Sequence, residues 1–186
     1  LIEVKVTDDT EDIFLATKYG LSIRFKESDV RITGRVSYGV IGMKLDPGDQ
    51  VIGMQMESQG EYMLVASEKG YGKRTRISEF TSSLRNGRGL LCYNVTEKTG
   101  CLVGMKLVDD ERDIMLITNE GILIRMSVDD ISVIGRNTSG VKLMSIDPDS
   151  NVRVATIAKV RESSHGDGEE DGEEIKTDLE NGNQNE

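Results

Sequence analysis

The chain repeats itself at an interval of about fifty residues, and this periodicity restricts its fold more than any other feature of the sequence. A Gly-x3-Arg unit occurs three times, and an Arg-x3-Gly-apolar unit follows each copy. Successive copies of each unit are separated by 50 and then 51 residues. The sequence therefore predicts three similar modules in series. The first unit begins at Gly20, Gly70 and Gly121, and the second begins at Arg35, Arg85 and Arg136.

Each module has the pattern of β-strands. In the first, the apolar run 13–17 leads through a turn at Gly20 into the alternating segment 21–25, which is typical of a β-hairpin. Two further strands are expected at 40–45 and 51–56, and the Asp-Pro-Gly-Asp sequence between them favours a turn. No part of the repeats shows a sustained helical period of apolar residues. We therefore expect four strands per repeat.

Four-stranded units of this length in series indicate an all-β, propeller-like architecture. Propeller rings hold about four to eight blades, so three units and a leftover strand do not close one, and we expect further sequence upstream. The prediction is about three four-stranded blades of a larger ring, plus a tail. The expected parts are the last strand of a preceding blade at 1–7, blades at 8–57, 58–108 and 109–160, and a disordered acidic tail at 161–186.

The net charge of −10 is concentrated at one end of the chain. Residues 1–160 hold 21 basic and 23 acidic side chains, whereas residues 161–186 hold 2 basic and 10 acidic ones. The large apolar residues of the second segment are Ile175 and Leu179 alone, so it cannot bury enough surface to offset the entropy of ordering. It acts either as a solubilising tail or as an intramolecular competitor for a basic face.

Several classes of site are excluded by composition. No apolar run approaches the roughly 18 residues of a membrane helix, and we expect no signal peptide and no membrane partner. Cys92 and Cys101 lack CxxC spacing, so we expect reduced thiols and a cytoplasmic location. His165, the only histidine, lies in the acidic tail, which leaves the repeats without a histidine-based triad or metal site. We expect no catalytic and no metal-binding residue in this chain.

The strongest local signal is a basic segment at 69–88, whose net charge is +5 and which is interleaved with glycine. Clustered Lys and Arg beside glycines, where the backbone can approach a partner, are suited to binding the phosphates of a nucleic acid. The alternative is a solvated strand face whose arginines cover neighbouring apolar surface. The candidate DNA contacts are Lys73, Arg74, Arg76, Arg85 and Arg88, with Arg35, Arg136 and Lys142 as further candidates.

Six arginines recur at matching places in the repeats. A residue of this kind either locks strand to strand or contacts a periodic polyanion that curves past each blade. Duplex DNA, with one negative charge per ~1.7 Å of axis, can follow such a stripe if it bends. The sequence leaves both roles open. The two sets are Arg24, Arg74 and Arg125, and Arg35, Arg85 and Arg136.

Two runs carry a resemblance to a known family. The sequences KGYGKRT at 69–75 and ISVIGRNTSGV at 131–141 are similar to stretches of the C-terminal domain of the bacterial DNA gyrase A protein, and the resemblance covers residues 1–160 in order and spacing. It implies a β-pinwheel, a six-bladed relative of the propeller in which neighbouring blades exchange strands. This chain would hold roughly the last three blades. The family's basic box of the form QRRGGKG is absent, and 85–89 is only a partial echo of it.

The resemblance also implies a function, namely binding and wrapping of duplex DNA within an ATP-dependent type II topoisomerase that introduces negative supercoils. The implied partners are double-stranded DNA, the rest of the gyrase A protein, and the gyrase B protein. ATP and Mg²⁺ would be bound by other domains of that complex, and no cofactor by this chain. Two alternatives are the C-terminal domain of the corresponding topoisomerase IV protein and a propeller-type platform for protein interactions without a nucleic-acid role.

Overall fold

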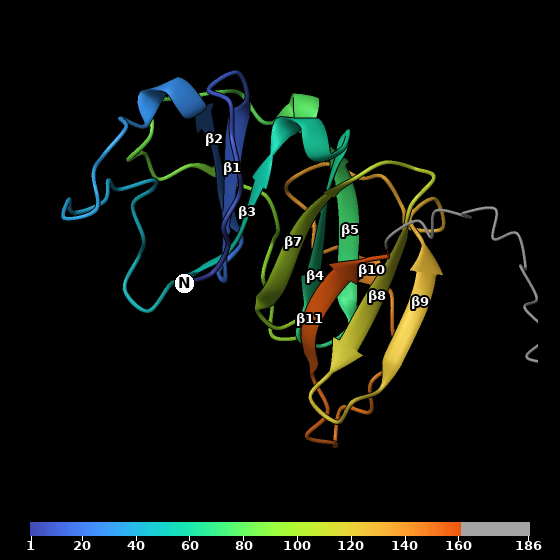
Figure 1. The fold of residues 1–186 in the computed structure, drawn as a ribbon. Helices are drawn as coiled ribbons and strands as arrows, with labels where there is room; N and C mark the ends of the chain where they lie inside the picture. The colour runs from blue at the N-terminus through green and yellow to red at the C-terminus, as the bar shows by residue number, and fades with distance from the viewer. Residues whose placement is uncertain (161–186) are drawn as a thin grey trace, which may run out of the picture.

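The computed structural model describes residues 1–160, which form strands and short 3-10 turns. The strands build three sheets that stand side by side, as the blades of a propeller do (Figure 1). Every strand pair in these sheets is antiparallel. The all-β prediction is therefore confirmed. The tail expected at 161–186 lies outside the described residues.

Each sheet is built on a hairpin to which a third strand is added. In the first sheet, β1 (Asp12–Thr17) pairs with β2 (Leu21–Lys26) on one side and with β3 (Val51–Met56) on the other. The corresponding strands are β4 (Tyr62–Ser67), β5 (Tyr71–Arg76) and β7 (Leu102–Val108) in the second sheet, and β8 (Asp113–Thr118), β9 (Leu123–Ser127) and β11 (Val154–Lys159) in the third.

The hairpins form where the sequence pattern predicts them. Gly20, Gly70 and Gly121 have φ angles of 88°, 79° and 81°, and glycine takes this left-handed conformation without steric cost. The amide of each glycine donates to the carbonyl three residues earlier at 3.1 Å, which closes the turn. The 3-10 turns η1 (Glu27–Asp29), η2 (Glu57–Gln59) and η3 (Ile77–Glu79) follow β2, β3 and β5.

A fourth strand is supplied to a sheet by the repeat that follows it in the chain. Strand β6 (Leu90–Leu91) of the second repeat pairs with β2 of the first, and β10 (Val141–Lys142) of the third repeat pairs with β5 of the second. These two sheets are four-stranded, as expected, whereas the third sheet has three strands within residues 1–160. Strand exchange between neighbouring repeats is thus a property of this chain.

Two strands expected from the sequence are not formed. The segment 40–45 contains only a one-residue bridge, between Met43 and Gly87, and the chain between β2 and β3 extends away from the other sheets (Figure 1). Residues 1–7, expected as the last strand of a preceding blade, pair with no strand among the described residues. The physical reason is shared, because a strand needs a neighbour for its backbone hydrogen bonds. The assignment of 1–7 to a preceding blade stays a prediction.

Apolar side chains fill the space between successive sheets. One cluster joins Phe14 of β1 to Phe80, Cys92 and Tyr93 of the second repeat, and the rings of Phe14 and Phe80 meet edge to face at 6.3 Å. Strand β7 packs against β3 on one side and β11 on the other, so these are the inner strands. Strands β6 and β10 therefore lie at the outer edges of their sheets. The part of the chain that the structure describes has no helix with the length and apolarity to span a bilayer.

Candidate nucleic-acid interface

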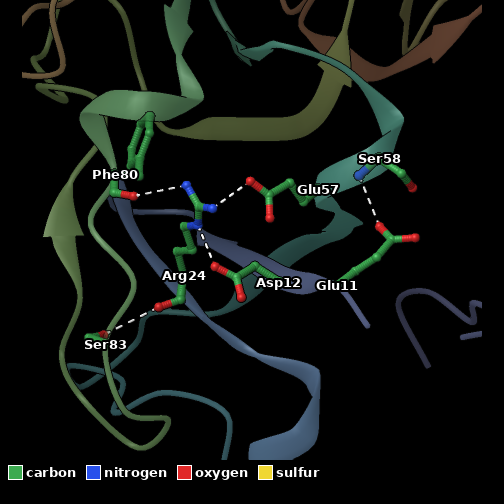
Figure 2. A network of polar contacts seen from close by, with 7 residues as sticks. All are labelled: Glu11, Asp12, Arg24, Glu57, Ser58, Phe80 and Ser83. Atoms are coloured by element: carbon green, nitrogen blue, oxygen red, sulfur yellow. Dashed lines mark hydrogen bonds and ion pairs between the residues drawn. The ribbon is translucent and has the colours of Figure 1, made fainter. Parts of the chain in front are cut away.

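The first of the recurring arginines joins two repeats. Arg24 lies on β2, and its Nε and Nη2 atoms bind the carboxylates of Asp12 and Glu57 at 2.6 and 2.5 Å (Figure 2). Its Nη1 donates to the carbonyl of Phe80 in the second repeat at 3.4 Å, and its own carbonyl accepts the amide of Ser83 at 2.8 Å. Arg24 thus holds the incoming segment of the second repeat against the first sheet.

Arg74 has the same role one repeat later. Its Nε donates to the carbonyl of Ile131 at 2.6 Å and its Nη2 to the carbonyl of Asp129 at 3.1 Å, while Nη1 is paired with the carboxylate of Asp110. Ile131 stands in the third repeat where Phe80 stands in the second. All three side-chain nitrogens of Arg74 therefore bind protein oxygens, and the residue is buried.

The second recurring set also binds the preceding repeat. Arg85 donates from Nε to the carbonyl of Asp29 at 2.9 Å and from Nη1 to the carbonyl of Ile41 at 3.3 Å. Arg136 donates from Nη1 to the carbonyl of Leu91 at 3.2 Å, the position equivalent to Ile41. Both side chains are half-buried. These contacts favour the structural role for Arg85 and Arg136.

The remaining member of each set lacks such a carbonyl within the described residues. Arg125 is 63% exposed, and its partner in the described part of the chain is Asp113, at 2.6 Å. Arg35 is exposed in the segment that extends away from the sheets. Four of the six recurring arginines therefore connect one repeat to the next. They recur in the sequence because the same contact forms between successive repeats.

Lys73, a predicted DNA contact, is enclosed. Its side chain has 0% relative exposure, and its Nζ donates to the carbonyls of Gly135 and Arg136 at 2.7 and 2.5 Å and to Oγ1 of Thr138 at 3.1 Å. An ammonium group has three donors, and all three are occupied. This placement revises the prediction for Lys73 and likewise for Arg74, because a buried cation with occupied donors cannot reach a phosphate. Lys73 instead anchors the 135–138 loop of the third repeat.

The enclosure of Lys73 makes stability depend on pH. Burial lowers the pKa of Lys73 from 10.5 to about 8, and burial raises the pKa of Cys92 from 9.0 to about 12. Between pH 8 and 9 the unfolded chain keeps the Lys73 proton that the folded chain releases, so the free energy of unfolding is expected to rise by about 1 kcal/mol. Above pH 9 the Cys92 thiol ionises only in the unfolded chain. This ionisation lowers the free energy of unfolding and so opposes the further rise that Lys73 causes.

Urea denaturation at a series of pH values measures this dependence. The variant Lys73→Met is expected to lose the rise between pH 8 and 9, and Cys92→Ala is expected to extend the rise above pH 9. A free energy of unfolding that is constant between pH 8 and 9 in the unmodified chain would show that the buried ammonium group does not titrate there.

The other predicted contacts lie at the surface. Arg76, at the end of β5, is exposed and stacks over the ring of Tyr62 with 5.2 Å between the guanidinium carbon and the ring centroid. Arg88 is exposed and pairs with Asp46 at 2.7 Å, an ion pair of the solvated kind that contributes little to stability. Lys142 is exposed on β10. With Arg35, these are the predicted contacts whose charges face solvent.

A basic pocket adjoins the outer edge of the second sheet. Its volume is about 310 Å³, and four basic side chains and one acidic side chain line it. Lys69 donates to a carbonyl, as does Arg153, and Lys98 lies over the ring of Tyr71 at 5.4 Å, so these three contacts leave the charges without a carboxylate partner. Four cations that line one pocket beside a single carboxylate are suited to an anion. The lining residues are Lys69, Tyr71, Lys98, Lys142, Ile146, Asp147, Pro148 and Arg153.

The predicted candidates missed most of this pocket. Of its basic residues the prediction includes Lys142 alone, because Lys98 and Arg153 lie outside the basic segment and reach the pocket only when β10 pairs with β5. Comparison of the repeats could have indicated the pocket, because polar or basic residues stand there at positions where the preceding repeat has leucine or glycine. The replacements are Tyr71 for Leu21, Lys98 for Gly48, Lys142 for Leu91 and Arg153 for Leu102. Residues 1–160 contain no group of three or more His, Cys, Asp or Glu side chains arranged to hold a metal ion.

Comparisons of the sequence and of the fold with known proteins point to one family. A family described as "DNA gyrase C-terminal domain, beta-propeller" matches residues 11–56, 61–109 and 112–161. The DNA gyrase A protein of Ureaplasma parvum serovar 3 is 41% identical over 162 residues, which are 87% of this chain and 19% of that protein. The DNA gyrase A protein of Staphylococcus aureus strain NCTC 8325 is 39% identical over 184 residues, 98% of this chain and 20% of that protein. The chain thus spans about a fifth of these relatives.

Solved structures share the three-sheet arrangement. The C-terminal domain of DNA gyrase A superposes with a TM-score of 0.76 at 29% identity, covering 83% of this chain and 52% of that one. The C-terminal domain of DNA topoisomerase IV superposes with a TM-score of 0.78 at 30% identity, covering 85% and 49%. Shape alone does not separate the two enzymes, whereas the sequence relatives above are gyrase proteins. Together with the exchanged strands, the matches show that this chain belongs to the DNA gyrase C-terminal domain family of β-propellers.

Proposed function

We propose that the chain binds duplex DNA through phosphate contacts at the outer edges of its sheets and thereby takes part in DNA wrapping by a gyrase. The observation that supports this is a set of solvent-facing cations on the fold of that family. Arg76 is the last residue of β5, and Lys142 on β10 lies beside the other end of β5, because it is opposite Tyr71 in the β10–β5 pair. At ~3.3 Å per residue they are roughly 17 Å apart, a span that a duplex covers with several phosphates.

The revised contact set keeps the exposed members of the prediction and adds the basic pocket. Arg35, Arg76, Arg88 and Lys142 stay as proposed contacts, and Lys98 is added. The buried Lys73 and Arg74, together with Arg85 and Arg136, hold the loops from which the exposed cations project. Contacts of this kind position a duplex without reading its bases.

Salt dependence of binding is the most direct test. About five phosphate contacts predict that the logarithm of the DNA association constant falls with the logarithm of salt concentration with a slope of roughly −4.5. Fluorescence anisotropy of a labelled duplex, measured with the full chain at several salt concentrations, gives this slope. A slope indistinguishable from zero, or no binding at low salt, would reject the proposal.

Neutralising the pocket tests which cations make the contacts. The double variant Lys98→Gln/Lys142→Gln is expected to make the slope about 1.8 units less steep, since each phosphate contact contributes ~0.9. The matched control is Lys106→Gln, because Lys106 lies on the inner strand β7 and is 3.7 Å from the carboxylate of Glu3. An equal loss in the double variant and the control would assign the binding to net charge rather than to this surface.

The wider assignments belong to the same proposal. The repeats 8–57, 58–108 and 109–160 would act as blades of a ring, working in the cytoplasm with the rest of the gyrase A protein and with the gyrase B protein. ATP and Mg²⁺ would be bound by other parts of that complex. The chain itself would contribute the DNA path and no catalytic group.

A further inference from the structure

The basic pocket is built by segments of two repeats that are far apart in the sequence. Tyr71 lies on β5, Lys98 lies in the turn that precedes β7, and Lys142 lies on β10, the strand that the third repeat supplies. Lys142 stands opposite Tyr71 in the β10–β5 pair, and Nζ of Lys98 lies 5.4 Å from the centroid of the Tyr71 ring. The pocket therefore exists only when β10 has paired with β5.

The charges of the pocket are not neutralised, unlike those of the buried cations at the joints between repeats. Lys98 and Lys142 are exposed, and neither has an oxygen partner within residues 1–160. The single carboxylate of the lining, that of Asp147, accepts the amide of Asp149 at 3.0 Å and pairs with none of the four cations in the described part of the chain. Like charges gathered in one pocket repel one another, and a bound anion removes this cost.

The blade fold does not require these cations. The first repeat forms the same hairpin with Leu21 where the second repeat has Tyr71. At the positions equivalent to lysines 69 and 98, the third repeat has the acidic residues Glu120 and Asp149. The positive charge of the pocket is thus specific to the second sheet, and formation of the hairpin does not account for it.

The size and lining of the pocket favour a small organic ligand over a lone phosphate group. Its volume of about 310 Å³ is at the lower end of the ~300–1,000 Å³ that is typical of small-molecule sites. Tyr71, Ile146 and Pro148 add apolar surface to the lining, and a bare phosphate would leave this surface in contact with water. A DNA duplex has a convex backbone that presents single phosphates, so it can cover the mouth of such a pocket without filling it.

We infer that the basic pocket binds a small organic diphosphate, in which adjacent phosphate groups are joined to an aromatic or apolar body of nucleoside size. The phosphate oxygens lie among the four cations, because Lys and Arg donate charge-assisted hydrogen bonds to phosphate. The body lies against Tyr71, Ile146 and Pro148. The carboxylate of Asp147 accepts hydrogen bonds from hydroxyl or amino groups of the body, which a bare phosphate lacks.

Ligand binding and DNA binding share two cations. Lys98 and Lys142 line the pocket and also belong to the proposed DNA contacts, so an occupied pocket neutralises them and weakens DNA binding. This competition rests on the proposed function, whereas the ligand site does not. The site and the competition are therefore tested by separate experiments.

Isothermal titration calorimetry of the full chain without DNA tests the ligand site. The probes are adenosine diphosphate, inorganic pyrophosphate and adenosine, which carry both halves of the ligand, the phosphates alone and the body alone. Adenosine diphosphate is expected to saturate the chain with one-to-one stoichiometry. The dissociation constants of pyrophosphate and of adenosine are each expected to be about tenfold higher or more, because each probe lacks one set of contacts.

Variants of the pocket separate the two halves of the site. Tyr71→Leu introduces the residue that the first repeat has at this place, and it is expected to raise the dissociation constant of adenosine diphosphate about two- to tenfold without changing that of pyrophosphate. Lys98→Gln/Lys142→Gln is expected to raise both constants about tenfold or more. The matched control Lys106→Gln, on β7, is expected to change neither. Circular dichroism of each variant verifies that the strands are retained.

Three results would overturn the inference. The first is a chain that adenosine diphosphate does not saturate at about 1 mM. The second is pyrophosphate binding as tight as that of adenosine diphosphate in both the unmodified chain and Tyr71→Leu, which would identify a site for phosphate alone. The third is a double variant that retains the full affinity for adenosine diphosphate, since binding would then occur elsewhere on the chain.

Displacement of a labelled duplex tests the competition. Saturating adenosine diphosphate is expected to lower the fluorescence anisotropy of the duplex more than sodium chloride of equal ionic strength does, because salt alone already weakens DNA binding. A duplex that stays bound beside the ligand would contradict the competition. A duplex that does not bind even without the ligand would reject the proposed function, and calorimetry would still decide the ligand site.

Discussion

Replacing Gly140 by alanine is expected to lower the free energy of unfolding by about 2–4 kcal/mol. Gly140 precedes the exchanged strand β10 with φ at 73°, and a Cβ added there would lie inside van der Waals contact with the carbonyl oxygen of Gly72. The obstructing atom belongs to the backbone of β5, so the clash is relieved only if the exchanged strand moves away. Urea denaturation followed by circular dichroism measures the change.

Gly39 is the matched control, because it occupies the same place in the first repeat. No atom lies within 4 Å of a Cβ built on it, and Gly39→Ala is therefore expected to change the stability of the monomer by no more than about 0.5 kcal/mol. Equal losses in the two variants would mean that the contact with β5, which Gly140 has and Gly39 lacks, does not determine the cost. Losses below about 0.5 kcal/mol in both would contradict the pairing of β10 with β5.

Replacing Arg74 by alanine is expected to lower the free energy of unfolding by about 2–3 kcal/mol. The substitution removes the donors for Ile131 and Asp129 and leaves Asp110 without its ion-pair partner at the joint between the second and third repeats. The carbonyl of the buried Ile131 loses its partner and retains the cost of desolvation, whereas Asp110 is 54% exposed and is hydrated by solvent. The same denaturation experiment measures the loss.

Arg125 tests whether position in the repeat or position in the fold determines this cost. It is equivalent to Arg74 in sequence, but its side chain is 63% exposed and, within residues 1–160, pairs with Asp113 alone. A solvated ion pair contributes about 0–1 kcal/mol, so Arg125→Ala is expected to be nearly neutral. If it destabilises the monomer as much as Arg74→Ala does, the inter-repeat carbonyl contacts are not the source of the effect.

The basic segment thus divides into two functional parts. Lys73 anchors the 135–138 loop directly before β10, and β10 carries the exposed Lys142 at the edge of the basic pocket. The buried cations set the position of the strand from which an exposed cation projects. If the chain binds DNA as proposed, substituting Lys73 is expected to weaken binding indirectly, through the placement of β10.

The sequence alone determined the repeat, the strand type and the family. Alternating apolar residues on either side of Gly20, Gly70 and Gly121 predicted the three hairpins, because alternation and a turn glycine are local properties that neighbouring residues specify. The resemblance carried by 131–141 and by the spacing of the repeats is confirmed by the family match. Arg76, Arg88 and Lys142 are exposed, and their role as DNA contacts stays a prediction.

Only the tertiary structure decided which charges face solvent and which strand completes each sheet. Lys73 stands where the other repeats have Ile23 and Ile124, and its position is interior even though its side chain is charged. The oxygens that make this burial possible lie more than sixty residues away, on a loop that the following repeat supplies. Local pattern determines whether a segment forms a strand, but a strand's partner depends on contacts between distant segments, and those contacts exist only once neighbouring repeats have exchanged their edges.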